Sequence, residues 1–70
     1  MTENGHAILQ VMRAHMGLSI GEVKILDAQG RDVWRIDAID AKGERWIATD
    51  ESHYRASCLL AGAVGFDLED

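Results

Sequence analysis

The chain has 70 residues, 47% of them hydrophobic, and its seven Lys and Arg against twelve Asp and Glu give a formal net charge of −5. A chain of this length forms one small domain whose core supplies only a few kcal/mol of stability. The single cysteine excludes an intramolecular disulfide, and the acidic balance argues against a general nucleic-acid binder because phosphates repel it.

The charge is uneven along the chain. Residues 1–35 hold four acidic and four basic residues, whereas residues 36–70 hold eight acidic and three basic ones. The opening MTENGH lacks the basic start of a secretory signal, and the longest uncharged stretch, residues 56–66, is too short to span a bilayer. We therefore expect a cytoplasmic protein that does not associate with membranes.

The first expected element is a helix over residues 3–16, which Gly17 is placed to end in a left-handed conformation. Thr2 or Asn4 can supply the oxygen that caps its start. Its apolar stripe follows the three-and-four spacing of one helix face. The stripe consists of Ala7, Ile8, Val11, Met12 and the His15/Met16 pair.

Three strands are expected over residues 22–27, 32–39 and 44–49, because these runs are rich in Val, Ile and Trp and are bounded by turn residues. In the middle strand, apolar residues alternate with charged ones, which predicts one buried and one solvated face. The outer face would hold Val33, Ile39 and Ile47 among Arg35, Asp37 and Arg45. Such a mixed surface would suit dimerisation or the docking of a partner.

The second hairpin has a clear predicted register. A three-residue loop over residues 41–43 pairs Asp40 with Glu44 and places Trp46 opposite Ala38, on the same face as the first tryptophan. For the first hairpin, a two-residue loop of Gln29 and Gly30 would pair Ile25 with Trp34, whereas a three-residue loop would align Lys24 with Trp34. We favour the two-residue loop, because it puts the apolar residues of the first strand on the buried face.

The tetrapeptide Asp-Ala-x-Gly occurs at residues 27–30 and again at residues 40–43. Neither copy has the further oxygen ligands of a calcium loop, and the two lie at opposite ends of the middle strand, so they cannot form one shared site. We expect two turns in which Asp accepts backbone hydrogen bonds and Gly adopts a positive φ.

The last expected element is a helix over residues 52–64, capped by Asp50 or Ser52 and closed by Gly65 and Phe66. Its inward stripe is predicted to be Ala56, Leu59, Leu60 and Ala63. The fold class is therefore α+β: an α-β-β-β-α chain with a three-stranded antiparallel meander and two helices packed on one face. We expect a single compact domain over residues 1–66 and an acidic C-terminal tail over residues 67–70.

This order of elements resembles the double-stranded-RNA-binding domain. The likeness covers most of the chain but is one of topology only. That family has a lysine-rich start to its second helix, which contacts phosphates. Here the same position reads DESHYRAS, with Arg55 as its only cation. The loop between the second and third strands, which reaches the RNA minor groove in that family, offers Lys42 and Arg45.

The conceivable metal ligands or nucleophiles are His6, His15, His53 and Cys58. His53 and Cys58 point about 140° apart on their helix, and His6 and His15 lie on opposite faces of theirs. Neither pair has a ligand spacing, so we expect no metal, no cofactor and no catalytic residues. Cys58 is interpreted as a small buried residue and His53 as a partly exposed polar one. With few acids and bases able to converge, we expect no enzymatic activity.

The favoured functional interpretation is a small acidic, non-catalytic protein-interaction module that binds a basic protein surface. Phage and mobile-element accessory proteins, including inhibitors, provide the analogy, which rests on size and charge. The residues expected to carry the affinity are Asp50, Glu51, Asp67, Glu69 and Asp70. Two alternatives remain: a degenerate double-stranded nucleic-acid binder using Lys42, Arg45 and the first helix, and a self-associating structural protein such as a homodimer.

Overall fold

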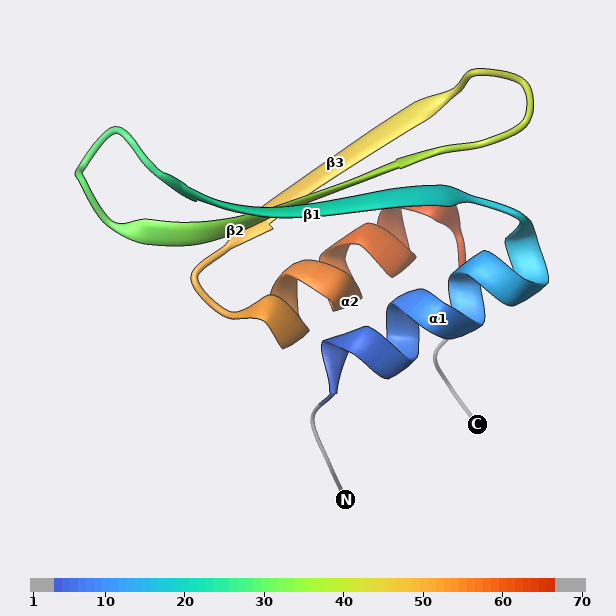
Figure 1. Cartoon of the computed structure of the whole chain (residues 1–70), viewed down its shortest axis with the longest axis horizontal. Helices are drawn as coiled ribbons and strands as arrows, with labels where there is room; N and C mark the ends of the chain where they lie inside the picture. The colour runs from blue at the N-terminus through green and yellow to red at the C-terminus, as the bar shows by residue number, and fades with distance from the viewer. Residues whose placement is uncertain (1–3, 67–70) are drawn as a thin grey trace.

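A computed structural model describes residues 4–66 of the chain. The elements follow the order α1, β1, β2, β3, α2 (Figure 1). Their bounds are Gly5–Met16, Ser19–Leu26, Asp32–Ile39, Arg45–Asp50 and His53–Val64. The predicted α+β class, with its three-stranded antiparallel meander, is confirmed. Within residues 4–66, no helix is long and apolar enough to cross a membrane.

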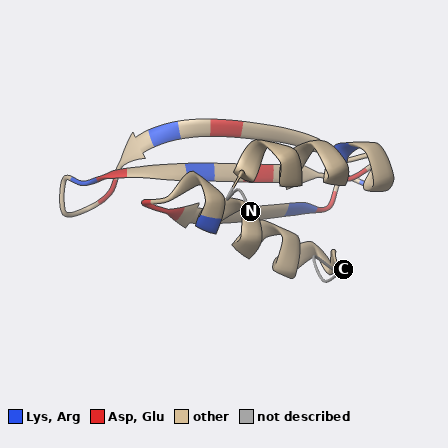
Figure 2. Cartoon of the chain, turned by 90° about the horizontal axis from the view of Figure 1, so that it is seen from below, with Lys and Arg blue, Asp and Glu red and all other residues tan. Residues whose placement is uncertain are grey.

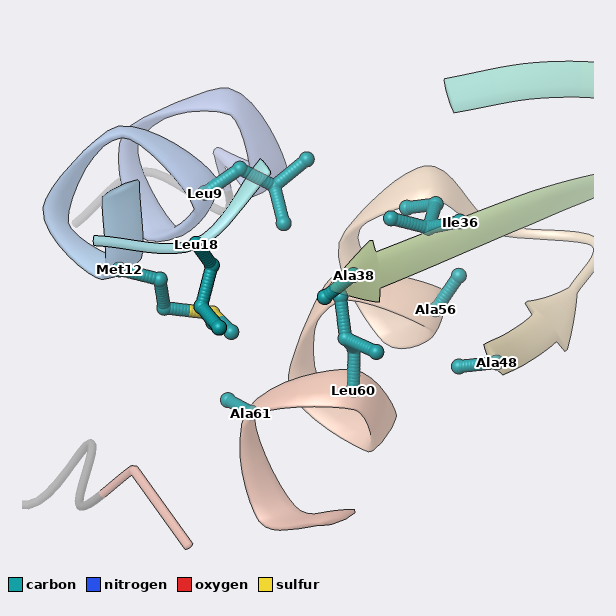
Figure 3. Packing of buried hydrophobic residues seen from close by; sticks show 9 residues of the cluster. All are labelled: Leu9, Met12, Leu18, Ile36, Ala38, Ala48, Ala56, Leu60 and Ala61. Carbon is teal, nitrogen blue, oxygen red and sulfur yellow. The ribbon is translucent and has the colours of Figure 1, made fainter. Parts of the chain in front are cut away.

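The two helices lie side by side against one face of the sheet, so the domain has two layers (Figure 1). The sheet order is β1-β2-β3. Between the layers, buried side chains from both helices and from β2 and β3 form one core (Figure 3). The core consists of Leu9, Met12, Leu18, Ile36, Ala38, Ala48, Ala56, Leu60 and Ala61.

The register of the second hairpin is as predicted. Trp46 pairs with Ala38 across β2 and β3, and the Asp40 N–H donates to the Glu44 carbonyl at 3.0 Å. Because Trp34 lies on the same face of β2 as Ala38, both tryptophans face the helix layer. Each is partly buried and packs against the core, which confirms their predicted common face.

The favoured register of the first hairpin is wrong. Lys24 pairs with Trp34 and Ile25 with Val33, which is the three-residue alternative. The side chains of Ile20, Glu22 and Lys24 therefore point toward the helices. The register also extends the pairing back to Ser19, so β1 begins before the predicted residue 22.

The two Asp-Ala-x-Gly segments make the same turn, which explains this register. Asp27 Oδ1 accepts the N–H groups of Gln29 and Arg31 at 2.8 and 2.9 Å. Asp40 Oδ1 accepts the N–H groups of the residues two and four positions later at 2.9 and 2.8 Å. Gly30 and Gly43 have φ values of 78° and 88°. The predicted turn chemistry is confirmed, and one motif encloses three residues in both loops.

Helix α1 begins later than predicted, and its buried stripe is displaced. Asn4 Oδ1 accepts the N–H groups of the second and third helical residues and caps the helix, one of the two predicted caps. The buried positions are Gly5, Leu9 and Met12, whereas the predicted Ala7 and Val11 are exposed. The displacement arises because α1 packs mainly against α2 rather than flat on the sheet.

Helix α2 shows the same kind of displacement. Ser52 Oγ caps it by accepting the Arg55 N–H, and the predicted ending at Phe66 is confirmed by its 2.8 Å bond to the Ala61 carbonyl. The predicted stripe positions Leu59 and Ala63 are exposed. The buried positions are Ala56, Ser57, Leu60 and Ala61. This stripe is rotated because α2 must contact both the sheet and α1.

The turn at Asp27 predicts a pH-dependent contribution to stability. The Arg31 N–H, with a smaller contribution from the Gln29 N–H, holds the pKa of Asp27 below its usual 3.8. A lowered folded-state pKa adds stability that is complete above the unfolded pKa and is lost as the pH falls through the folded one. Asp27→Asn keeps the acceptor oxygen but removes the titration. We expect the free energy of unfolding, measured in urea, to fall more between about pH 6 and pH 2 for the wild type than for Asp27→Asn. Equal losses in both proteins would contradict this expectation.

Candidate functional site

The sheet face opposite the helices is open, and the register of β1 makes it more apolar than predicted. Within residues 4–66, neither helix covers this face. Its aliphatic residues come from all three strands: Val23, Ile25, Val33, Ile39 and Ile47. Ile25 and Val33 are directly opposite each other on neighbouring strands. Val23 and Ile47 have exposed fractions of 48% and 47%. The aliphatic side chains form two groups, Val23, Ile25 and Val33 at one end and Ile39 and Ile47 at the other, and exposed apolar area of this kind favours contact with another surface.

Charged residues interrupt this patch without covering it. Arg35 and Asp37 on β2 and Arg45 on β3 project from the same face. Figure 2 shows that charged residues follow the strands and turns, whereas each helix carries a single one, Arg13 or Arg55. The sheet face thus combines apolar area with a few fixed charges that can orient a partner.

Asp50 and Glu51, two of the predicted partner-binding acids, lie where β3 passes into α2. They line a shallow depression together with Asp27, Arg31, Val33, Thr49 and Arg55. Both acids already have partners inside the protein. Asp50 Oδ1 accepts the Ser52 N–H at 2.9 Å, and Glu51 Oε2 lies 2.7 Å from the Arg31 guanidinium. The other three predicted acids, Asp67, Glu69 and Asp70, lie outside the described residues.

The residues of the nucleic-acid alternative lie near each other at the opposite end of the sheet. Lys42 is in the turn between β2 and β3, and Arg45 begins β3; both are exposed. The described residues carry seven basic and eight acidic groups, so most of the acidic excess of −5 comes from Glu3 and residues 67–70.

A second feature lies on the helix-facing side, around the carboxylate of Glu22. His53 Nε2 is 2.7 Å from Glu22 Oε1, and His6 Nδ1 is 3.5 Å from the same oxygen. Arg13 Nη2 is 3.4 Å from Glu22 Oε2 and also donates to the Ile20 carbonyl at 3.1 Å. These four side chains, His6, Arg13, Glu22 and His53, come from α1, β1 and α2, and we call them the Glu22 cluster.

Within the Glu22 cluster, Glu22 and His53 are partly buried and His6 and Arg13 are exposed, and the surroundings favour an ionised carboxylate. The exposed fractions of the Glu22 and His53 side chains are 20% and 14%, whereas that of His6 is 73%. Partial burial raises the pKa of Glu22, but hydrogen bonds from His53 and Arg13 outweigh it and hold the pKa below its usual 4.5. Both histidines lie in the first turns of their helices, whose positive ends also stabilise a negative charge.

Aromatic packing fixes the position of the His53 ring. The His6 ring stacks on it with a centroid distance of 4.3 Å, and Trp34 meets it edge-on at 4.8 Å. Gly5 allows this arrangement, because a Cβ there would overlap the His53 ring and lie 2.7 Å from Ser57 Oγ. The buried Gly5 therefore lets α1 lie close to His53 and Ser57 of α2, beside the cluster.

Sequence reasoning missed the Glu22 cluster. It compared histidines only within one helix, and the favoured register turned Glu22 away from the helices. His53 is partly exposed as predicted, at 14% of its side chain, whereas Cys58 is partly exposed rather than buried. His15 lies on the exposed side of α1. The correct signal was the repeated Asp-Ala-x-Gly motif, because equal turns imply equal loop lengths and hence an inward Glu22.

Comparison of the chain with protein-family models, with curated proteins and with solved structures finds no match. The structure shows the α-β-β-β-α order and the antiparallel meander, but no match to a family or to a solved structure supports the resemblance to the double-stranded-RNA-binding domain. Function has to be inferred from the open sheet face and the Glu22 cluster themselves.

Removing the carboxylate of the Glu22 cluster should destabilise the fold. Glu22→Ala leaves Arg13 and the mostly buried His53 without their shared acceptor, which costs about 1–3 kcal/mol of unfolding free energy. Glu44→Ala, at an exposed turn position, should change it by less than about 0.5 kcal/mol. Urea denaturation at neutral pH measures both. A Glu22 variant as stable as the Glu44 variant would show that the cluster adds no stability.

The close approach at Gly5 gives a second stability prediction. Gly5→Ala should cost about 1–3 kcal/mol, because the new methyl group must displace His53 and Ser57. Gly62→Ala in α2 is the matched control, since nothing lies within 4 Å of a Cβ there. Alanine should stabilise that position by up to about 1 kcal/mol. Chemical denaturation measures both variants. An unchanged free energy of unfolding in Gly5→Ala would contradict the close contact of Gly5 with His53 and Ser57.

Proposed function

We propose that this chain is a small, non-catalytic protein-interaction module that docks a partner protein through its open sheet face. The observation that supports this proposal is the patch of five aliphatic side chains on a sheet face that neither helix covers within residues 4–66. Val23 and Ile47 are about half exposed and Ile25 and Ile39 partly so, whereas Val33 is already buried. The exposed area of the first four favours association, because it contributes free energy when removed from water.

The dimensions of the face indicate a modest complex. Strands of eight, eight and six residues span an area of about 350 Å², from rises of about 3.3 Å and strand spacings of about 4.8 Å. A stable interface buries about 800 Å² on each partner. The partner must therefore also contact the edges of the sheet or the acidic ends of the chain. Strands β1 and β3 are edge strands and can accept an added strand.

The charge of the chain favours a partner with a basic surface. The net charge of −5 attracts such a surface over long distances and opposes association between two copies of the chain. Asp50 accepts a backbone hydrogen bond and Glu51 pairs with the exposed Arg31, so a basic partner would compete with Arg31 for Glu51.

A nucleic-acid partner is less well supported by the same surface. Single-stranded nucleic acids bind sheet faces through aromatic side chains on which bases stack. The open face of residues 4–66 carries aliphatic residues instead, since Trp34 and Trp46 face the helices. Lys42 and Arg45 alone offer few phosphate contacts.

The proposal predicts that charges placed at the two most exposed positions of the patch, one on each edge strand, abolish partner binding. Val23→Glu combined with Ile47→Glu should remove binding with little effect on folding, since both side chains are about half exposed. Affinity capture from host lysate, quantified by mass spectrometry and checked by circular dichroism, measures this. The matched control is Leu59→Glu, which charges an exposed apolar position of α2 instead.

The expected result is a basic protein captured by the wild type and by Leu59→Glu but not by the double variant. Capture of that protein by the double variant, or its loss with Leu59→Glu alone, would overturn the assignment to the sheet face. Light scattering of the wild type and of the double variant adds a further check, because a homodimer of the wild type that the double variant loses would show that a second copy occupies the face instead.

A further inference from the structure

The Glu22 cluster contains a set of metal-binding atoms that the sequence spacing did not reveal. One ligand atom from each of His6, Glu22 and His53 lies within 4.8 Å of the other two. The three residues come from the first turn of α1, the inner face of β1 and the first turn of α2. The fold thus brings two imidazoles and one carboxylate, far apart in the sequence, to one place.

We propose that His6, Glu22 and His53 form a binding site for a divalent transition-metal ion, with Zn²⁺ as the best fit. Two histidines and one carboxylate with an open fourth position are a recurrent Zn²⁺ ligand set. Imidazole nitrogens favour such ions over Mg²⁺ and Ca²⁺, which prefer oxygen ligands. Water would complete a tetrahedral shell.

The His6 ring must turn before the site can accept the ion, because it is stacked on the His53 ring and the two ring planes are nearly parallel. In a tetrahedral shell with bonds of about 2.0–2.1 Å, ligand atoms lie about 3.3 Å apart. The His6–Glu22 distance of 3.5 Å already matches, and the His53–Glu22 distance of 2.7 Å must open slightly. His6 is 73% exposed, so its ring can turn toward the ion without disturbing the core.

Neighbouring groups hold two of the three ligands in place, as outer-shell contacts do in metal sites. Arg13 binds Glu22 Oε2, which leaves Oε1 directed at the histidines. Trp34 and the close approach of Gly5 restrict the His53 ring. Arg13 and the two helix N-termini repel a cation, however, so the site should bind Zn²⁺ more weakly than a four-ligand structural site does.

The same contacts without a metal would form an ion-pair cluster that ties α2 to β1, and His6 distinguishes the two cases. His6 is mostly exposed and adds little to an ion-pair cluster, whereas it supplies one of three ligands to a metal site. Removing its ring should therefore cost the metal-free protein only the exposed stacking contact with His53, but should strongly weaken the response to Zn²⁺.

The test uses the full chain without an affinity tag, titrated with ZnCl₂ in a calorimeter and melted with and without the ion. We expect one Zn²⁺ per chain and a higher melting temperature, because an ion that binds only the folded state stabilises it. His6→Ala should weaken binding at least about tenfold. Replacing Zn²⁺ with Co²⁺ should give the visible absorption of a tetrahedral ion, and MgCl₂ should give no heat of binding.

Two variants control for the other metal-binding groups of the described chain. His15→Ala removes an exposed histidine of the same helix, and Cys58→Ser removes the lone thiol; both should bind Zn²⁺ as the wild type does. Absence of binding by the wild type at millimolar Zn²⁺, full binding by His6→Ala, or loss of binding in either control would overturn the proposal. The site lies on the helix-facing side of the sheet, so its failure would leave the proposed docking face untouched.

Discussion

The register between β1 and β2 is the constraint on which both candidate sites depend. With Lys24 opposite Trp34, Glu22 faces the helices and Val23 and Ile25 face outward. A shift of one residue would exchange the two faces of β1 and remove both the inward carboxylate and part of the aliphatic patch. The turn at Asp27 sets this register, because its carboxylate accepts two backbone N–H groups only around a three-residue loop.

The inward-facing Glu22 loses hydration, but neighbouring groups offset this cost. A carboxylate on the buried side of a sheet loses hydration, which must be replaced by hydrogen bonds or charge. The Glu22 cluster supplies both, and Lys24 lies 5.5 Å from the centroid of the Trp34 ring, a distance at which a cation is attracted to its face. Since β1 is an edge strand and α1 packs mainly on α2, few apolar contacts are lost there.

The core buries little apolar area, so contacts outside it matter more for stability. Four of its nine residues are alanines, which let α2 lie close to β2 and β3 but bury little apolar area. A domain of this size has a small margin of stability. The Glu22 cluster adds polar contacts that join α1, α2 and β1. The open sheet face retains apolar area that a bound partner can cover.

The sequence by itself determined the element order, the turn chemistry at Asp27 and Asp40, and the helix C-terminal ends at Gly17 and Gly65, because these depend on neighbouring residues. It also determined the register of the second hairpin, because the three-residue turn places both tryptophans on the same face of the sheet. Tertiary structure alone decided which helix faces are buried and brought His6 and His53 to Glu22. The apolar periodicity of a helix predicts one buried face against one layer. It could not show these contacts, since each helix here packs against both the sheet and the other helix.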